Sequence, residues 1–171
     1  MFVVECDPEW PHRYDEERAR IVAALGELIA AIEHVGSTAV PGLGGKPVID
    51  FMIGVARLED GERRVGPLET LGYVYCGEAG IPGRLFFRKD VPRTHQIHLV
   101  EQGGDFWEDT LLFRDFLRAH PETAAEYSDL KKELAARFRT EREAYADAKT
   151  PFIRPVLERA RRALRPKPPR R

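Results

Sequence analysis

Residues 36–50 read GSTAVPGLGGKPVID, a glycine-rich connection between two predicted strands. The residues before it, 32–35, predict a short strand. The run at 47–55 is β-branched and nearly all apolar, which is typical of a central strand. Asp50 is the one charged residue in that run. Burying a carboxylate without a partner costs on the order of several kcal/mol, so we expect a metal ion or a lysine beside it.

This connection combines groups that suit a nucleoside triphosphate. Gly36 lets the backbone approach a ligand closely, Ser37 and Thr38 with their neighbouring amides can donate hydrogen bonds to phosphate oxygens, and Lys46 adds a positive charge. Asp50 could hold Mg²⁺ against those oxygens. Neither GxxxxGK[ST] nor GxGxxG is present. The alternative is a plain turn in which loop amides or Lys46 satisfy Asp50.

Strands are expected in the first hundred residues and helices in the rest. The predicted elements of the first part are helices over 12–31 and 59–71 and strands over 73–76, 84–89 and 95–101. Three apolar stripes with helical spacing follow residue 105. This order predicts an α+β domain with a small mixed sheet and a helical C-terminal half.

Composition sets the class of protein. The 171 residues are 43% hydrophobic and 32% charged with a net charge of −1, which predicts one globular domain over 1–164 and a basic flexible tail over 165–171. No apolar run reaches the ~20 residues of a membrane-spanning helix, and the start has no secretion signal. Cys6 and Cys76 lack a metal-binding or disulfide spacing. We expect a cytoplasmic protein that binds neither membrane nor nucleic acid; its oligomeric state stays open.

Long motifs along nearly the whole chain resemble the bacterial GrpB family, which is also found fused behind some dephospho-CoA kinases. The motif of residues 36–50 is similar to the signature of that family. The other matching segments are Asp7-Pro8-Glu9-Trp10-Pro11, His95-x-x-His98-Leu99-Val100, residues 113–121 and residues 144–153.

The resemblance implies a nucleotidyltransferase-like fold of the polymerase-β type. It also implies Mg²⁺-dependent transfer of a nucleotidyl group from a nucleoside triphosphate to an unknown small-molecule acceptor. Asp50 is then the metal ligand, and Asp50 and His98 are the candidate catalytic residues. Gly36, Ser37 and Lys46 are candidates for nucleotide binding, with Thr38 beside them. The basic cluster near the strand at 84–89 adds Arg88, which shares a face with Arg84.

One departure bears on activity. Transferases of this fold usually carry two acids, two residues apart, on the strand, but this chain has Asp50-Phe51-Met52. A thioether is a poor ligand for Mg²⁺. The alternative function is a catalytically inactive module that binds a nucleotide or a coenzyme-A precursor, and a third reading is a scaffold for partner proteins.

Histidines offer a second metal hypothesis. His98 and Asp50, with His34, could form a site for Zn²⁺ or Mn²⁺ if their strands are neighbours. His95 and His98 have opposite parity in a regular strand, so both cannot join this site without a bulge. Such histidines are more often structural, hydrogen-bonded residues.

Overall fold

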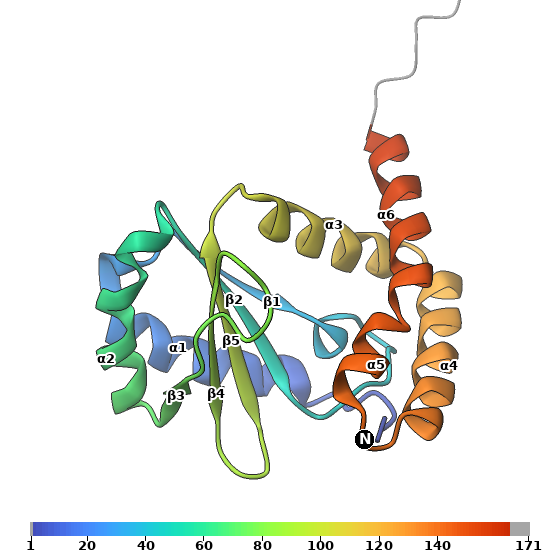
Figure 1. Ribbon diagram of the computed structural model, residues 1–171, viewed down its shortest axis with the longest axis horizontal. Helices are drawn as coiled ribbons and strands as arrows, with labels where there is room; N and C mark the ends of the chain where they lie inside the picture. The colour runs from blue at the N-terminus through green and yellow to red at the C-terminus, as the bar shows by residue number, and fades with distance from the viewer. Residues whose placement is uncertain (1, 165–171) are drawn as a thin grey trace, which may run out of the picture.

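The computed structural model describes residues 2–164, which form a mixed sheet flanked by helices (Figure 1). The sheet order is β1-β2-β5-β4-β3. Strands β2 and β5 pair in parallel, and the other neighbours are antiparallel. The strands are β1 (Ala31–Val35), β2 (Ile49–Val55), β3 (Tyr73–Tyr75), β4 (Arg84–Lys89) and β5 (His95–Glu101).

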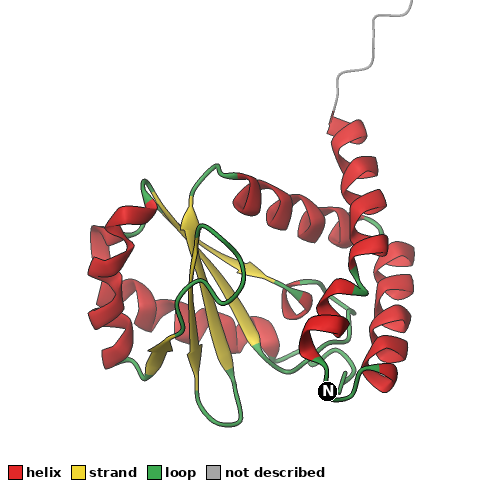
Figure 2. Cartoon of the chain, in the orientation of Figure 1, coloured by secondary structure: helices red, strands yellow, loops and turns green. Residues whose placement is uncertain are grey.

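Helices cover both sides of the sheet (Figure 2). The α-helices are α1 (Trp10–Leu25), α2 (Glu62–Thr70), α3 (Asp105–Ala119), α4 (Pro121–Arg137), α5 (Arg142–Asp147) and α6 (Thr150–Leu164). Short 3₁₀ turns are η1 (Gly26–Leu28), η2 (Ser37–Ala39) and η3 (Leu58–Gly61). The α+β fold with a helical C-terminal half is therefore confirmed.

One face of the sheet forms the main core. Alternate residues of β2 and β5, including Phe51, Ile53 and Ile97, point to this face and are fully buried. Trp10 of α1 and Leu68 of α2 pack against them. Because β2 lies inside the sheet and is covered on both faces, its sequence is a continuous apolar run rather than an alternating one.

The opposite face of the sheet carries the candidate site residues Asp50 and His98. The β2 and β5 register pairs Asp50 with Gln96 and Met52 with His98, so these four side chains share this face. Helix α3 covers the Met52 end, where Trp107 packs against that methionine. The Asp50 end is left uncovered by α3 and borders a cleft.

The C-terminal helices pack against the 36–45 connection. Val40 and Leu43 of that connection are buried with Leu117 of α3 and Tyr127 of α4. In Figure 1, α4, α5 and α6 stand beyond the β1 edge of the sheet, and α6 projects away from the body. The glycine-rich connection therefore lies between the sheet and the helical half.

The first helix is shorter than predicted. It ends at Leu25, because Gly26 adopts a positive φ of 54° and the chain then makes the turn η1 before β1. The apolar residues beyond it, Leu28, Ile29 and Ile32, still pack on the same core, which explains why the apolar spacing continued past the end of the helix.

Two other expectations from the sequence were a basic tail and the absence of a membrane-spanning helix. The basic tail, 165–171, lies outside the described residues. Among residues 2–164, no helix combines the length and the apolar character needed to cross a bilayer.

Candidate functional site

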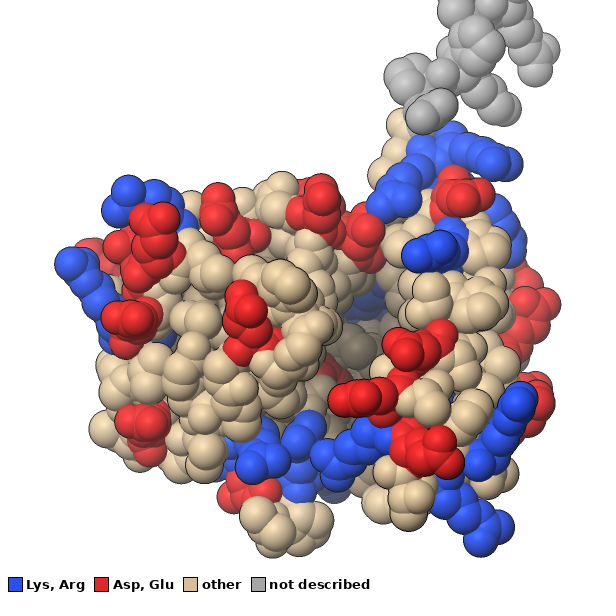
Figure 3. Space-filling view, in the orientation of Figure 1, with Lys and Arg blue, Asp and Glu red and all other residues tan. Residues whose placement is uncertain are grey.

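A cleft of about 570 Å³ lies between the sheet and the C-terminal helices. Figure 3 shows this hollow, with lysine and arginine side chains gathered along its lower rim. Among the described lining residues, the basic ones are Lys46, Arg93, Arg114, Lys131, Arg142 and Lys149. The acidic ones are Asp50 and Asp109. The excess of basic side chains favours an anionic ligand.

Gly36 and Asp50 meet at the edge of the cleft. A Cβ atom built on Gly36 would lie 2.5 Å from Asp50 Oδ2, closer than real Cβ contacts. The backbone of Gly36 has φ 73° and ψ −168°, a region that only glycine adopts readily. The glycine is therefore required both by its conformation and by the carboxylate against it.

We expect Gly36→Ala to lower the free energy of unfolding by about 2–4 kcal/mol, because backbone strain adds to displacement of Asp50. Gly42→Ala is the matched control, since Gly42 also has a positive φ of 76° but nothing lies within 4 Å of an added Cβ. Urea denaturation of both variants measures the difference. Equal losses in the two variants would show that contact with Asp50 adds nothing.

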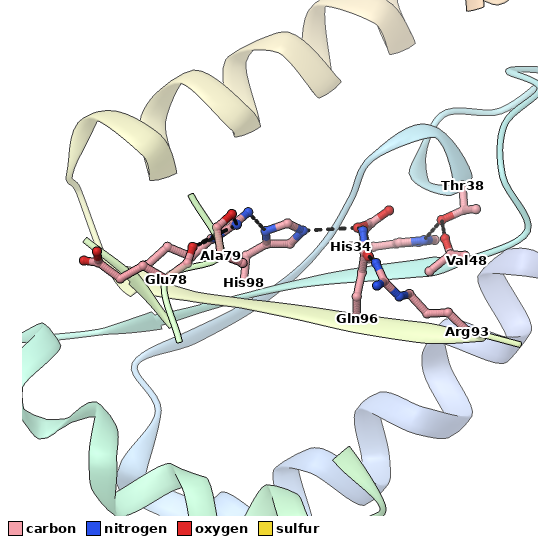
Figure 4. Close-up of polar contacts among 10 residues, drawn as sticks. His34, Thr38, Val48, Glu78, Ala79, Arg93, Gln96 and His98 are labelled. Atoms are coloured by element: carbon pink, nitrogen blue, oxygen red, sulfur yellow. Dashed lines mark hydrogen bonds and ion pairs between the residues drawn. The ribbon is translucent and has the colours of Figure 1, made fainter. Parts of the chain in front are cut away.

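Asp50 is held by a row of hydrogen bonds (Figure 4). Gln96 Nε2 donates to Asp50 Oδ1, and His98 Nε2 lies 3.2 Å from the same oxygen. On the other side of the ring, Arg84 Nη1 lies 3.1 Å from His98 Nδ1. A guanidinium can only donate, so Nδ1 accepts and the proton of the imidazole sits on Nε2. His98 is thereby oriented as a donor to Asp50.

Arg84 is fixed in turn by backbone carbonyls. Its Nε and Nη2 atoms donate to the carbonyl of Glu78 at 3.2 and 3.0 Å, and Nη2 also donates to that of Ala79 at 3.0 Å. The side chain is buried, with a residue exposure of 6%. This arrangement favours a positioning role for His98, which holds the Asp50 carboxylate, over the direct catalytic role that was expected of it.

Ser37 contacts a buried lysine of α4. Lys131 Nζ lies 2.7 Å from Ser37 Oγ and also donates to the carbonyl of Gly44. Lys131 is 3% exposed, and its Nζ lies 4.9 Å from the ring centre of Tyr127. The lysine thus links Ser37 and Gly44, two residues of the glycine-rich connection that was predicted to bind phosphate.

Three lysines form a cluster in the cleft: Lys46, Lys131 and Lys149. Burial, and then the charge of Lys149, lower the pKa of Lys131 to about 7. Burial, followed by the charge of Lys149 and of arginines near it, also lowers the pKa of Lys46. Burial lowers the pKa of Lys149, although Asp50 opposes this shift. The positive charge of one lysine disfavours the charged form of its neighbours, and a bound anion would favour it.

Lys46 and Lys149 also share an aromatic partner. Their Nζ atoms lie 4.9 and 4.8 Å from the ring centre of Tyr145. Arg114 differs, because it pairs with Glu33 at 2.6 Å and donates to the carbonyl of His34. The lysines are therefore the better candidates for ligand contacts.

The structure brings most of the predicted site residues together. Gly36, Ser37, Lys46, Asp50 and His98 all line the cleft. The other two predicted residues do not line it. Thr38 Oγ1 lies 2.9 Å from His34 Nε2 instead, and Arg88 is exposed on β4.

The predicted association of His34 with Asp50 is wrong. In β1, Val35 pairs with Asp50 and His34 pairs with Phe51, so His34 belongs to the core face. It stacks on Tyr14 with ring centres 4.4 Å apart, and burial is the largest cause that lowers its pKa to about 4. Among residues 2–164, no three His, Cys, Asp or Glu side chains form a metal-binding group.

The sequence analysis missed Lys131 and Gln96. Lys131 lies four residues after Tyr127 and three before Leu134, which places it on the buried stripe of α4. A lysine on the apolar stripe of a predicted helix is unusual, and this could have identified Lys131 from the sequence. Gln96 becomes recognisable only once the register of β2 and β5 is known.

These features define a small α+β protein with a cationic cleft on one face of a mixed sheet. A sequence model of a family described as GrpB protein matches residues 1–159. The chain belongs to the GrpB family.

Known relatives support this assignment. The chain is 42% identical over 95% of its length to the UPF0157 protein PA4798 of Pseudomonas aeruginosa, covering 69% of that protein. It is 40% identical over 94% of its length to the UPF0157 protein YqkA of Bacillus subtilis, and spans about half of that relative (47%). It also resembles the crystal structure of GrpB from Enterococcus faecalis, with a TM-score of 0.84, 34% identity, and coverage of 95% of this chain and 98% of that one.

Similarity to dephospho-CoA kinases is also found. The chain is 29% identical over 92% of its length to a protein named dephospho-CoA kinase from Mycolicibacterium paratuberculosis, and covers 45% of it.

Proposed function

We propose that the cleft binds a nucleoside triphosphate and that the protein transfers its nucleotidyl group, with Mg²⁺, to a small-molecule acceptor. The observation that carries the proposal is the lysine cluster beside Ser37 and Asp50, inside the cleft. Ammonium groups and a serine hydroxyl are donors that suit phosphate oxygens. A volume of about 570 Å³ lies within the usual range for small-molecule sites, roughly 300–1,000 Å³.

The remainder of the cleft suits the less polar part of a ligand. Phe106, Phe113 and Leu117 of α3 line it, together with Ile153 and Leu157 of α6. A base or an acceptor could pack there while the phosphates contact the lysines. The site thus offers separate polar and apolar regions, as ligand sites commonly do.

Asp50 suits a metal ion that arrives with the nucleotide. Mg²⁺ commonly uses one or two carboxylates and takes its other ligands from phosphates and water, and Asp50 supplies one such carboxylate at the cleft. When bound, Mg²⁺ neutralises charge on the phosphate oxygens. His98 and Gln96 hold Asp50 in place for this role, and Mn²⁺ could take the same ligands.

Met52 favours a second candidate function, nucleotide binding without transfer. The position where a second acid is expected holds a methionine with 0% exposure, packed against Trp107. Without a second carboxylate, this strand offers metal ions one ligand instead of two, which weakens the case for a two-metal site that activates the acceptor. This candidate is a nucleotide or coenzyme-A-precursor sensor, a reading to which the resemblance to dephospho-CoA kinases lends weight.

Titration of the purified protein with ATP, GTP, CTP and UTP, in EDTA, Mg²⁺ or Mn²⁺, tests both functions. We expect Mg²⁺ to tighten binding of at least one nucleotide by about tenfold, about 1.4 kcal/mol, and Asp50→Asn to abolish this gain. Asp109→Asn is the control, because Asp109 also lines the cleft but takes no part in the Asp50 network.

Three outcomes separate the readings. Metal-dependent binding with pyrophosphate release, measured with a panel of candidate hydroxyl and amine acceptors, supports transfer. Metal-independent binding without pyrophosphate release supports the sensor. No saturable binding of any nucleotide contradicts transfer and nucleotide sensing. A further titration with dephospho-CoA then separates a coenzyme-A-precursor sensor, which binds it, from a scaffold protein, which binds neither. The cytoplasmic location stays a prediction that cell fractionation can test.

A further inference from the structure

The Lys131 corner of the cleft, made by Ser37, Gly44, Gly45 and Lys131, has a property that nucleotide binding in general does not require. The ammonium of Lys131 is buried, yet its partners there are a hydroxyl and a carbonyl oxygen. Among the described residues, no carboxylate forms an ion pair with it. A buried cation without an anion is unfavourable unless a ligand supplies the charge.

The surroundings of Lys131 add no negative charge. The groups that face it are the Ser37 hydroxyl, the Tyr127 ring from its own helix, and Lys149, whose charge acts on it. Tyr145, near Tyr127, belongs to α5. Burial raises the pKa of both tyrosines, so they stay neutral at physiological pH.

The Lys131 corner lies at one end of a row of contacts. Asp50 touches Gly36, the next residue is Ser37, and Ser37 touches Lys131. An added Cβ on Gly45 would lie 2.5 Å from Ser37 Cβ and 3.8 Å from Lys131 Nζ, which shows how closely the backbone encloses this end. A chain of phosphates that begins near Asp50 would therefore place its last phosphate at Lys131.

We infer that the Lys131 corner is the subsite for the terminal, dianionic phosphoryl group of the nucleotide, and that Lys131 selects this group over a phosphodiester. The inference rests on the proposed function and names the part of the ligand that lies at the Lys131 corner. A terminal phosphoryl group has a second ionisation near pH 6 and carries close to two charges at pH 7 to 8. A diester carries one charge, which compensates a buried ammonium less well.

Proton uptake is the consequence that can be measured. With a pKa of about 7, the free Lys131 amine is largely neutral at pH 8. A phosphate dianion against it favours the charged form and raises its pKa. Binding at pH 8 must then take up close to one proton, and affinity must fall by about tenfold per pH unit above pH 7.

Calorimetric titration of ATP at pH 8, in two buffers of different protonation enthalpy, measures this uptake. We expect the wild type to take up close to one proton more than Lys131→Arg, because a guanidinium is already charged. Lys131→Arg should also flatten the pH dependence of affinity between pH 7 and 9. For the wild type, ATP with a methyl ester on its γ-phosphate should bind at least about tenfold more weakly than ATP, a loss of about 1.4 kcal/mol.

Two control variants test whether the proton uptake belongs to Lys131. Lys132→Arg, one residue along α4, should behave as the wild type, because Lys132 points away from the cleft to pair with Glu5. Lys149→Arg should keep the proton uptake whatever its affinity, because Lys131 is intact. Lys131→Met tests the charge itself and should lose both the uptake and the preference for ATP over its methyl ester.

The outcomes distinguish this inference from the proposed function. Saturable ATP binding without proton uptake, or with the same uptake in Lys131→Arg as in the wild type, would overturn the subsite while nucleotide binding stands. Equal affinity for ATP and its γ-methyl ester would overturn it as well. Absence of binding of all four nucleotides, ATP, GTP, CTP and UTP, at every pH would overturn the proposed function and the inference together.

Discussion

Replacing Lys46 and Lys149 together with methionine is expected to weaken ATP binding by about 100-fold. Each lysine offers a charge-assisted hydrogen bond to phosphate, worth roughly 1.5–3 kcal/mol, and a loss of about 2.8 kcal/mol corresponds to 100-fold in the dissociation constant. Both side chains lie over the Tyr145 ring. Methionine packs well against aromatic rings, so the variant removes charge while keeping contact.

The folded state should not suffer from this double change. Burial, and then the charges of Lys149 and nearby arginines, lower the pKa of Lys46, so removing these charges relieves an unfavourable burial and repulsion between like charges. We therefore expect a midpoint of thermal unfolding at or above that of the wild type in the absence of ligand. A loss of binding in a more stable protein cannot be ascribed to unfolding.

Exposed basic residues provide the control for the double variant. Lys132→Met combined with Arg57→Met removes two charges that pair with exposed or half-exposed acids away from the cleft. ATP affinity at 50 and 300 mM salt, measured by calorimetry, should change little in this control. If both double variants lose affinity equally, net charge rather than the lysine cluster attracts the nucleotide.

Glu17→Gln is expected to lower the free energy of unfolding by about 3 kcal/mol, the usual range for breaking a buried ion pair. Glu17 of α1 is 1% exposed in the core. Its Oε1 accepts from Lys89 Nζ at 2.9 Å and from the Tyr73 hydroxyl at 3.0 Å, and its Oε2 accepts from Arg20 at 3.0 Å. The amide of glutamine keeps the size but leaves the Lys89 charge without its partner.

The pH dependence of this loss has a definite sign. Burial by itself raises the pKa of Glu17, but the hydrogen bond and charge of Lys89, together with bonds from Tyr73 and Arg20, outweigh it and lower the pKa below 4.5. The stabilisation is therefore present above pH 4.5 and is lost as pH falls through the pKa of the folded state. Urea unfolding at pH 7 and pH 3 should show the wild type and the variant converging in acid.

Glu16→Gln is the control for the buried acid. Glu16 is the preceding residue of α1, and its exposed carboxylate lies 3.6 Å from His12. Exposed pairs contribute roughly 0–1 kcal/mol, so this variant should unfold almost as the wild type does. A gap between wild type and Glu17→Gln that does not change with pH would show that lost packing, rather than lost charge, destabilises the variant.

Strands could be predicted where both their residue types and the turn residues at their ends are recognisable in the sequence. The predicted bounds 84–89 and 95–101 agree with β4 and β5, because an apolar or aromatic run is followed by turn-forming residues 90–93. The first helix was extended too far, since apolar spacing reports burial and not backbone conformation. Residues such as Ile29 contribute to the core from outside the helix.

Much of the candidate site could be predicted because it is local in sequence. Gly36, Ser37, Lys46 and Asp50 lie within fifteen consecutive residues. The connection that holds them joins two antiparallel neighbours, β1 and β2, so its start lies beside Asp50. Lys131 could not be associated with Ser37 in this way, because the contact depends on how α4 packs against the connection. The direction of the His34 side chain in β1 could not be predicted either, because the pairing of Val35 with Asp50 is known only from the register.

A crystal structure of the protein with ATP and Mg²⁺ tests the central claim most directly. The account predicts triphosphate density in the cleft between Ser37 and the lysine cluster, with the terminal phosphate against Lys131 Nζ and the nearest metal ligand at Asp50. Nucleotide bound on another surface, or a cleft that stays empty when ATP, GTP, CTP or UTP is supplied in turn at saturating concentration, would contradict it.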